Sequence, residues 1–265
     1  MLHAPTTRRE RIVLYGDRGD GKSSSYISIA DWLEKTHSDR RVWLVDSDKG
    51  WDGNRAEDGS LDAYVRVLRV DKETFGGDSG WLAQVRKIRG QVHPDDWFVV
   101  DLQTHAWEGA QRWYWGQKTG NDSLAELWLR NRAQDIAGDH GTNWGVINKF
   151  YGEFTSAVVN LPCHVMLLAS AAPIRMPNEG GKGGDDLDTR SFYDGVGMRI
   201  EGQKDLRGEG HTVIYCFEAN GKYRYTTVKE RGPLGRVRRR RMTNEDVTDT
   251  GFVPGYLIRV CGWRP

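Results

Sequence analysis

Short apolar runs alternate with amphipathic stretches along most of the chain. Apolar runs of strand length predict buried strands at Arg11–Tyr15, Arg41–Asp46, Tyr64–Val70, Trp97–Asp101 and Cys163–Ser170. Apolar positions at helical spacing predict helices over Lys22–Thr36, from about Thr104 onward, and over Trp144–Val159 with Asn143 as a cap. Because strands apolar on both faces alternate with helices, we expect a mostly parallel sheet flanked by helices.

The second half of the chain carries turn signals. Asn220-Gly221 separates two alternating segments and predicts a hairpin of strands Thr212–Ala219 and Lys222–Lys229. Pro173–Thr189 is rich in Gly and Asp and is expected to be a mobile loop, and Val253–Trp263 is expected to hold one more strand. The predicted fold is therefore α/β, one domain, with an antiparallel C-terminal hairpin at the edge of the sheet.

The composition narrows the function classes without naming one. A net charge of +1 argues against a chain that is basic throughout, but it leaves room for a local basic face. Cys163, Cys216 and Cys261 lack metal-ligand spacing, so we expect buried thiols in a reducing compartment. No apolar run reaches the roughly 18 residues of a membrane helix, and Met1–Arg11 lacks a signal-peptide core, so we expect a cytoplasmic protein without membrane contact.

Residues 16 to 23 read GDRGDGKS, a P-loop pattern G-x-x-x-x-G-K-[ST] between a predicted strand and a predicted helix. Glycines let such a loop turn its N–H groups toward phosphate oxygens, and the helix N-terminus adds positive potential. We expect Lys22 to neutralise the β- and γ-phosphates of ATP and Ser23 to bind Mg²⁺. The expected nucleotide contacts are Gly16, Asp17, Arg18, Gly19, Asp20, Gly21, Lys22, Ser23 and Ser24.

Asp101 ends the apolar run that begins at Trp97. Beside a P-loop, a carboxylate at a strand end can hold the Mg²⁺ shell through water, whereas taken alone it is an ordinary strand-ending aspartate. The next residue is Leu102, not the glutamate that many ATPases place there, which disfavours AAA+ machines and DNA-packaging motors. Asn148-Lys149 lacks the aspartate of a guanine-reading N-K-x-D, which disfavours a GTPase.

A second carboxylate follows the strand Arg41–Asp46, in the sequence Asp46-Ser47-Asp48. Because the carboxyl ends of parallel strands line one crevice, Asp48 can orient a water toward the γ-phosphate. A solvated loop acid is the equal alternative by position alone.

The order of these motifs resembles the ATPase core of the bacterial recombinase RecA, and more closely the small phage RecA-like ATPases linked to single-strand annealing and recombination. The likeness rests on strand–P-loop–helix, V-D-S-D at 45–48, V-V-D at 99–101 and the strand at 163–170, and it covers roughly residues 11–232. In RecA the second strand ends I-D-A-E, and its glutamate activates the water. The resemblance places Asp48, one methylene shorter, on that glutamate.

The resemblance implies further site residues. Ser170 falls on a polar residue that senses the γ-phosphate. Lys229 and Arg231, in the sequence YTTVKER at 225–231, fall on the K-x-K cations that reach the neighbouring subunit's ATP, so self-association is implied. The pattern alone leaves them open as two solvated charges at the end of a hairpin.

Single-stranded DNA is the partner that the resemblance implies. The loop Pro173–Phe192 would contact phosphates through Arg175, Lys182 and Arg190, and bases through Phe192 or Tyr193, although its acids leave a plain connector as an equal alternative. The segment RVRRRR predicts phosphate binding through Arg236, Arg238, Arg239, Arg240 and Arg241, against a merely solvated charge run. Trp107, Trp113, Tyr114 and Trp115 favour core packing over stacking on bases, because Trp107 and Tyr114 share a helical spacing.

We therefore expect an ATP- and Mg²⁺-dependent RecA-type ATPase that acts on single-stranded DNA in phage-type recombination or replication, in the host's cytoplasm if phage-encoded. Its expected parts are a tail at 1–10, an ATPase core at 11–232 and a basic extension at 233–265 packed on the core. Two other classes remain open. One is a nucleotide-dependent assembly or loading factor with a protein partner and slow hydrolysis, and the other is a small-molecule P-loop kinase.

Overall fold

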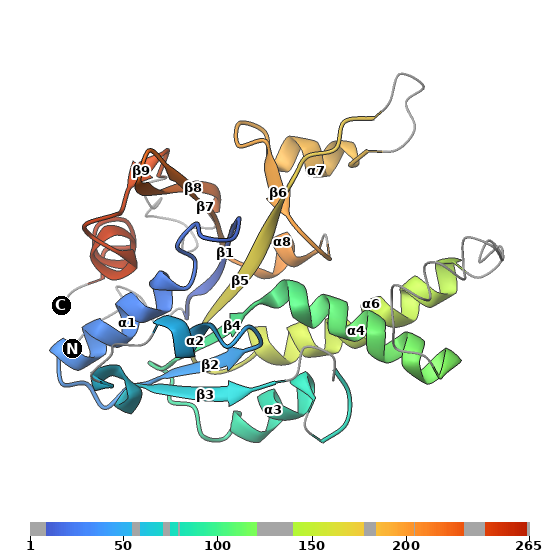
Figure 1. Ribbon diagram of the computed structural model, residues 1–265, viewed down its shortest axis with the longest axis horizontal. Coiled ribbons are helices and arrows are strands. Elements are labelled where there is room, and N and C mark those ends of the chain that lie inside the picture. Colours follow the sequence, from blue (N-terminus) through green and yellow to red (C-terminus); the bar gives the residue numbers. More distant parts are fainter. Residues whose placement is uncertain are drawn as a thin grey trace.

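A mostly parallel sheet forms the centre of the computed structural model, which describes residues 9–54, 59–70, 75–78, 80–120, 140–177, 184–203, 205–230 and 242–263 (Figure 1). Within these residues, the parallel strands run in the order β3-β2-β4-β5-β1-β7. Their bounds are β1 Arg11–Gly16, β2 Val42–Asp46, β3 Val65–Arg69, β4 Trp97–Asp101, β5 His164–Pro173 and β7 Thr212–Ala219. The predicted α/β class with a mostly parallel sheet is confirmed.

Antiparallel strands extend this sheet. Strand β8 (Lys222–Glu230) pairs with β7, β9 (Glu245–Asp246) pairs with β8, and β6 (Met198–Ile200) pairs with the end of β5. Asn220 and Gly221 turn the β7–β8 hairpin with φ angles of 57° and 72°. Two consecutive positive φ angles are the geometry that a two-residue hairpin loop prefers, so the predicted hairpin is confirmed.

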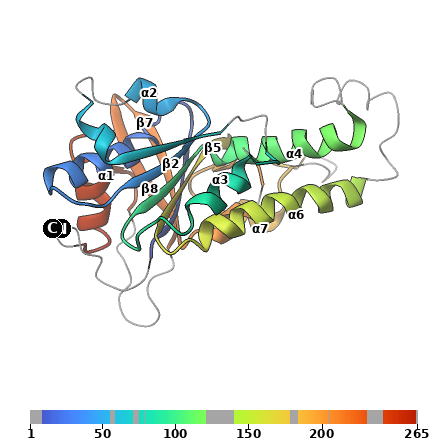
Figure 2. The same cartoon turned by 90° about the horizontal axis from the view of Figure 1, so that it is seen from below.

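Helices cover both faces of the sheet. One core contains side chains of α1 (Ser24–Lys35), η1 (Ser60–Ala63) and η3 (Val253–Ile258). The other contains side chains of α3 (Trp81–Ile88), α4 (Gln103–Thr119) and α6 (His140–Val159). The shorter helices are α2 (Gly50–Asn54), α7 (Leu187–Phe192) and α8 (Leu206–Glu209). Figure 2 shows α4 and α6 running alongside each other and extending beyond the sheet.

Strand β1 explains why the parallel strands have continuous apolar sequences. Ile12 and Leu14 belong to the core beneath α1, whereas Val13 and Tyr15 belong to the core on the opposite face. Full burial of each such side chain contributes about 1.5–3 kcal/mol of transfer free energy. Helix α1 instead buries one stripe, at positions i, i+3, i+4 and i+7: Tyr26, Ile29, Ala30 and Leu33.

The C-terminal segment differs from its prediction. Val253–Trp263 was expected to hold a strand, and this expectation is wrong because Val253–Ile258 form a short π-helical segment. Pro254 has no N–H to give to a sheet, and its carbonyl accepts a bond from the N–H of Arg259, 3.3 Å away. The side chains of Val253, Tyr256, Leu257 and Val260 are buried at helical spacing.

Two further boundaries differ. Helix α6 begins at His140, ahead of the predicted Trp144. The segment predicted as a mobile loop is partly regular, because β5 continues through Pro173 and α7 begins at Leu187. Asp186 caps α7 by accepting a bond of 2.7 Å from the N–H of Thr189.

The described part of the C-terminal extension, residues 242–263, packs on the rest of the fold. Met242, Val247 and Phe252 lie in the same core as the buried stripe of α1, and Thr227 on β8 exchanges hydrogen bonds with Met242. All three cysteines are buried, which confirms their prediction as core thiols.

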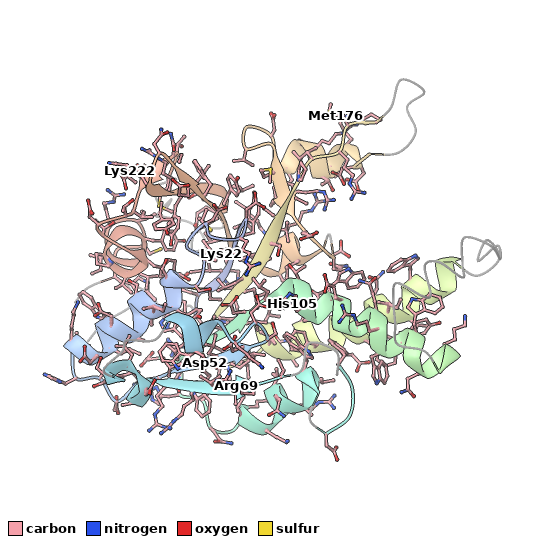
Figure 3. All side chains as sticks on the ribbon, viewed as in Figure 1. Lys22, Asp52, Arg69, His105, Met176 and Lys222 are labelled. Atoms are coloured by element: carbon pink, nitrogen blue, oxygen red, sulfur yellow. The ribbon has the colours of Figure 1, made fainter. Side chains whose placement is uncertain are left out.

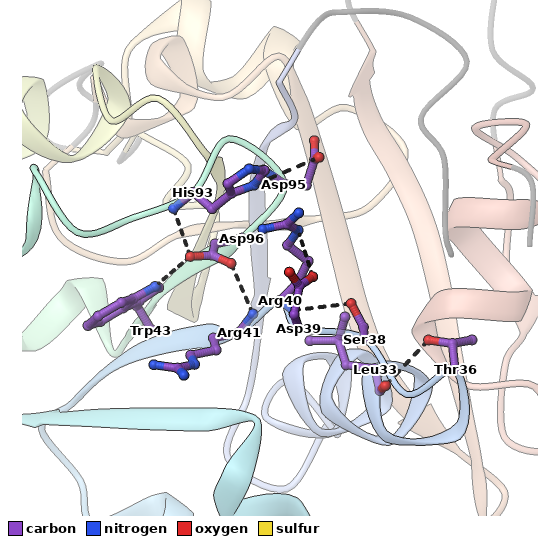
Figure 4. A network of polar contacts seen from close by, with 10 residues as sticks. All are labelled: Leu33, Thr36, Ser38, Asp39, Arg40, Arg41, Trp43, His93, Asp95 and Asp96. Carbon is purple, nitrogen blue, oxygen red and sulfur yellow. Dashed lines mark hydrogen bonds and ion pairs between the residues drawn. The ribbon is translucent and has the colours of Figure 1, made fainter.

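A buried carboxylate joins the amino ends of β2 and β4 (Figure 4). Asp96 accepts bonds from the N–H of Arg41 (3.0 Å), the indole N–H of Trp43 (2.9 Å) and the N–H of His93 (2.9 Å). Asp96 is only 4% exposed, so these donors compensate the loss of water around its oxygens.

His164, at the start of β5, is a buried histidine next to this network. Its Nδ1 accepts the N–H of Glu10 at 3.0 Å, and its ring lies 4.9 Å from the centroids of both Trp97 and Trp263. Burial lowers the pKa of His164 to about 3, and the positive charges of Arg9 and Arg11 act in the same direction. The imidazole is therefore neutral in the folded chain at pH 7.

We expect this histidine to make the fold acid-sensitive. Unfolded His has a pKa near 6.5, so the unfolded chain binds one more proton between about pH 6.5 and pH 3, and stability falls as the pH falls. Protonation of this histidine in the unfolded chain lowers the free energy of unfolding by about 2 kcal/mol between pH 7 and pH 5. His164→Asn keeps an acceptor for the Glu10 N–H but cannot take up the proton. Denaturant unfolding at both pH values should show a stability loss on acidification that is about 2 kcal/mol smaller in the variant. Equal losses in the two proteins would contradict the assignment.

Candidate active site

The segment Gly16–Ser23, here called the glycine loop, joins the carboxyl end of β1 to the N-terminus of α1. Gly19 and Gly21 have φ angles of 92° and 76°, where other residues are strained. A Cβ atom at Gly16 would collide with the carbonyl oxygen of Cys216 on β7. The three glycines of the loop, two of which belong to the pattern, are therefore required by backbone conformation or by close packing.

Asp20 fixes the shape of the glycine loop. Its Oδ2 accepts the N–H of Asp17 at 2.5 Å, and its Oδ1 accepts the N–H of Glu218 on β7 at 3.0 Å. The carboxylate thus holds the loop closed and ties it to the neighbouring strand.

Lys22 lies at the centre of the glycine loop and is 9% exposed. Its Nζ donates to the carbonyl of Gly16 at 2.9 Å and to that of Asp17 at 2.6 Å. Helix α1 begins two residues later, so the ammonium and the positive end of the helix dipole lie together. An anion at this point would meet both.

Ser23 and Asp101 join two loops that are remote in sequence. The Ser23 hydroxyl donates to Oδ2 of Asp101, at the end of β4, over 2.8 Å. Burial raises the pKa of Asp101 to about 6, the Ser23 bond opposes this rise, and the charges of Asp46 and Asp48 add to it. A hydroxyl and a desolvated carboxylate form a hard oxygen pair, which fits Mg²⁺ because the cation would compensate the buried charge.

The three residues after Val45 have different partners. Asp46 is 2% exposed and accepts the N–H groups of Gly50 (3.0 Å) and Trp51 (3.2 Å), where α2 begins. Ser47 bonds the carbonyl of Asp101 through its N–H (2.8 Å) and its hydroxyl (2.9 Å). The loops that follow the neighbouring strands β2 and β4 are therefore tied together.

Asp48 follows Ser47, whose hydrogen bonds join the two loops, and its side chain contacts helix α4. Its Oδ1 is 3.1 Å from Nδ1 of His105, and its side chain is 43% exposed. Ser170 reaches the same region from β5, where it is level with Gly16 in the parallel pairing. The Ser170 N–H donates to Oγ1 of Thr104 at 3.0 Å, which links β5 to the first turn of α4.

One cavity of about 790 Å³ brings these residues together. It opens at the carboxyl ends of the parallel strands, where α/β sheets commonly bind ligands. Nine of the residues that line it were predicted as site residues: Arg18, Gly19, Gly21, Lys22, Ser23, Ser24, Asp48, Asp101 and Ser170. The others are Gly50, Leu102, His105 and Tyr223.

Sequence reasoning missed two of the side chains in the cavity, His105 and Tyr223. His105 lies in the first turn of α4, and Figure 3 labels it together with Lys22. Its position four residues after Asp101 was the one sequence feature that could have indicated a place in the same site. Tyr223 comes from β8 and approaches Gly21, where an added Cβ would lie 3.0 Å from its ring. No local pattern marks that approach.

Lys229 lies outside the lining of this cavity. Its Nζ donates to the carbonyls of Arg207 (2.7 Å) and Gly210 (2.7 Å), around the C-terminal end of α8. A cation at a helix C-terminus is favourable, so Lys229 has a contact within its own chain. Arg231 lies outside the described residues, and the expected action of both cations on a neighbouring subunit stays a prediction.

The candidate DNA contacts fall in two groups. Arg175 is exposed just after β5, and its N–H donates to Asp185 at 2.7 Å; Arg190 is half-buried on α7. The remaining candidates lie outside the described residues: Lys182, Arg236, Arg238, Arg239, Arg240 and Arg241. DNA contact by either group stays a prediction.

Tyr193 does not have the environment of a base-stacking residue. It is 2% exposed and packs edge-on against Tyr15, with ring centroids 5.7 Å apart. The expectation that it can stack on bases is wrong, because its ring belongs to the core. Phe192 is half-buried, and the guanidinium of Arg207 lies 5.2 Å from its ring centroid.

The aromatic residues of α4 pack within the protein. Trp107 stacks on Trp144 at 6.0 Å, and Trp113 packs edge-on against Phe150 at 4.5 Å. Tyr114 packs against the core beneath α4. The prediction of core packing is confirmed for Trp107, Trp113 and Tyr114. Trp115 is half-buried and packs against Tyr114, with ring centroids 5.3 Å apart, so its part of the prediction is not confirmed.

Among the residues that the structure describes, no helix combines the length and the apolar character needed to span a membrane. Nor does any group of three His, Cys, Asp or Glu side chains among them have the arrangement of a metal cluster. The Ser23–Asp101 pair does not depend on such a cluster, because Mg²⁺ usually retains water and substrate oxygens as ligands. No protein-family model matches the chain, and no curated protein matches it significantly.

Proposed function

We propose that the chain is a RecA-type ATPase that binds ATP with Mg²⁺ and acts on single-stranded DNA in phage-type recombination or replication. One observation carries the proposal. Lys22, Ser23, Asp101 and Asp48 come from the ends of three parallel strands and line one cavity. Each has the charge or oxygen ligand that phosphoryl transfer requires.

The glycine loop supplies the phosphate site in this proposal. Its N–H groups and the N-terminus of α1 would surround the phosphates, as in P-loop proteins. The Lys22 ammonium, now bonded to the carbonyls of Gly16 and Asp17, would bond the β- and γ-phosphates instead. The buried position of Lys22 strengthens this interaction because little water competes.

Ser23 and Asp101 would hold the metal ion in this proposal. Mg²⁺ supplies Lewis-acid polarisation of the phosphates when bound. The Ser23 hydroxyl would be a direct ligand and Asp101 would hold the metal's water shell. Asp48 supplies a carboxylate at the open side of the cavity, and Ser170 a hydroxyl at the end of β5.

The places of the residues that carry the resemblance to RecA support the RecA type. Asp48 follows β2, Asp101 is the last residue of the adjacent strand β4, and Ser170 on β5 pairs with Gly16 of β1. A chance match of short motifs would not be expected to converge on one cavity. The single-stranded DNA partner rests on the resemblance and on the arginine-rich segment.

The proposal is tested by measuring ATP turnover with and without single-stranded DNA, using duplex DNA as the control. Stimulation by single strands is the expected result. Slow turnover that DNA does not change would favour a nucleotide-dependent assembly factor. Transfer of phosphate to a metabolite would favour a small-molecule kinase.

Removal of the arginine run is expected to weaken binding of single strands across all sequences. Each cation that no longer binds a phosphate lowers the slope of log affinity against log salt by about 0.7. Changing Arg238, Arg239, Arg240 and Arg241 to alanine should therefore flatten that slope by up to about 2.8. The charge-matched control changes four exposed cations elsewhere: Lys35, Arg66, Arg86 and Arg89. If both variants keep the wild-type slope, the arginine run is a solvated surface feature.

A further inference from the structure

Asp48 and His105 form a side-chain pair that joins the loops after β2 and β4. Asp48 Oδ1 lies 3.1 Å from Nδ1 of His105, and both residues line the cavity that contains Lys22 and Asp101. The imidazole comes from the first turn of α4, where the N–H of His105 donates to the carbonyl of Leu102 at 3.1 Å. On the other side of the pair, the N–H of Ser47, next to Asp48, donates to the carbonyl of Asp101 at 2.8 Å, so backbone hydrogen bonds hold both loops.

The contacts of Ser47 and Asp48 indicate which nitrogen of His105 carries a proton. The Ser47 hydroxyl lies 2.9 Å from the carbonyl oxygen of Asp101, which only accepts, so the one hydroxyl proton points there. The same hydroxyl oxygen accepts the N–H of Leu102 at 3.0 Å. It also lies 2.9 Å from Nδ1 of His105. The Asp48 carboxylate, which only accepts, is 3.1 Å from the same nitrogen, so the two contacts together favour Nδ1–H as the donor.

This assignment leaves Nε2 of the neutral imidazole as an acceptor. Nδ1–H then donates to the Ser47 hydroxyl, and the Asp48 carboxylate lies 3.1 Å from the same nitrogen. A carboxylate on Nδ1–H holds the ring in one tautomer and stabilises the cation that forms when Nε2 takes a proton.

The two side chains of the pair differ in their contact with water. The Asp48 side chain is 43% exposed, whereas that of His105 is 19% exposed. A carboxylate is intrinsically a weaker base than an imidazole, whose basicity suits proton transfer near pH 7. The geometry therefore favours the imidazole as the proton acceptor and the carboxylate as its support.

We propose that His105 is the general base of ATP hydrolysis and that Asp48 is a positioning residue that acts through it, a proposal that rests on the proposed function. Nε2 takes one proton from the attacking water, and the water oxygen forms a bond to the γ-phosphorus. The bond from that phosphorus to the β–γ bridging oxygen breaks, and its electron pair stays on ADP. The imidazolium then returns its proton to solvent, so the products are ADP, phosphate and one released proton.

The test is a double-mutant cycle in the full-length chain with Mg²⁺ and single-stranded DNA. Single-turnover hydrolysis and ATP affinity are measured for wild type, Asp48→Ala, His105→Ala and the double variant. His105→Ala should lose at least about 100-fold in rate, the lower range for a general base. Asp48→Ala should lose at least about tenfold, and the double variant should be no slower than His105→Ala. ATP affinity should change by less than about threefold in each, because neither side chain is assigned to phosphate binding.

Imidazole added to the buffer separates a chemical role from a structural one. Imidazole should raise the hydrolysis rate of His105→Ala at least about tenfold, because it can enter the space that the side chain leaves. It should not restore Lys22→Met. His105→Asn keeps an N–H toward Asp48 and should fold normally but remain as slow as His105→Ala. His93→Ala, which removes an exposed histidine elsewhere, should keep the wild-type rate.

The outcomes separate this proposal from the proposed function. Wild-type rates in both His105 variants, with slow hydrolysis in Asp48→Ala, would make Asp48 the direct base and leave the ATPase intact. Two further results would overturn the assignment of His105 as the base and Asp48 as its positioning residue. One is a double variant whose loss of rate equals the product of the two single losses, and the other is a slow His105→Ala variant that imidazole does not rescue. Absence of hydrolysis by the wild-type chain under every condition would overturn both proposals.

Discussion

Removing the charge of Lys22 is expected to lower ATP hydrolysis at least about 100-fold, which corresponds to about 2.7 kcal/mol of barrier. Lys22 is 9% exposed and its ammonium bonds the carbonyls of Gly16 and Asp17 inside the glycine loop, so we expect no other group to replace its proposed bonds to the phosphates. Lys22→Met is the sharper variant because it keeps most of the buried stem, and Lys22→Ala removes stem and charge together. Steady-state hydrolysis and equilibrium ATP binding should both report the loss.

The matched control is Lys35→Ala on the same helix. Lys35 is exposed and pairs with Asp31 at 2.8 Å, so its removal takes away one positive charge of α1 far from the loop. It should leave hydrolysis unchanged within about twofold, since an exposed ion pair contributes little to stability and lies at the other end of the helix. If the folded Lys22→Met protein keeps the wild-type ATP affinity and turnover, the glycine loop is not the ATP site.

Hydrolysis is expected to depend on contact between subunits. In the proposed RecA-type arrangement, Lys229 and Arg231 act on a neighbour's γ-phosphate, and a cation supplied in this way contributes on the order of 10³-fold. Specific activity should rise with protein concentration, and further on single-stranded DNA. Mixing Lys22→Ala subunits with Lys229→Ala/Arg231→Ala subunits should restore activity. In a random one-to-one mixture, about a quarter of the head-to-tail interfaces combine an intact loop with intact cations.

The contacts of Lys229 determine the controls for this experiment. Because its Nζ bonds carbonyls at the end of α8, Lys229→Ala is expected to cost about 1 kcal/mol of stability in addition to any catalytic effect. Arg231→Ala alone is therefore the second partner in the mixing experiment, and unfolding curves of each variant separate the two effects. Turnover independent of protein concentration, with no recovery on mixing, would make both cations surface charges and favour a monomeric nucleotide switch.

Local signals were sufficient to predict the glycine loop and the hairpin. The glycines of residues 16–23 and the pair Asn220-Gly221 need backbone conformations that few other residues adopt, so the sequence records them directly. The placement of Asp48 and Asp101 at one edge followed from a general property of parallel strands, and the pairing of Asp46 with Asp101 bears it out.

Long-range contacts account for the features that were missed. His105 contacts Asp48 and Ser47, which lie more than fifty residues earlier, and its proposed role depends on these contacts; a single histidine in a helix carries no periodic signal. Tyr223 meets Gly21 only because the β7–β8 hairpin pairs beside β1. Apolar periodicity also cannot separate a short strand from a short helix, which is why Val253–Trp263 was assigned to the wrong element despite Pro254.

ATP affinity of the wild-type chain, measured with Mg²⁺ and again with a chelator, tests the central claim most directly. If the glycine loop holds the phosphates while Ser23 and Asp101 hold the metal, Mg²⁺ should tighten ATP binding at least about tenfold, or about 1.4 kcal/mol. Ser23→Ala should lose most of that gain while keeping metal-free binding. No binding of ATP, or binding that is equally tight with the chelator, would contradict the account.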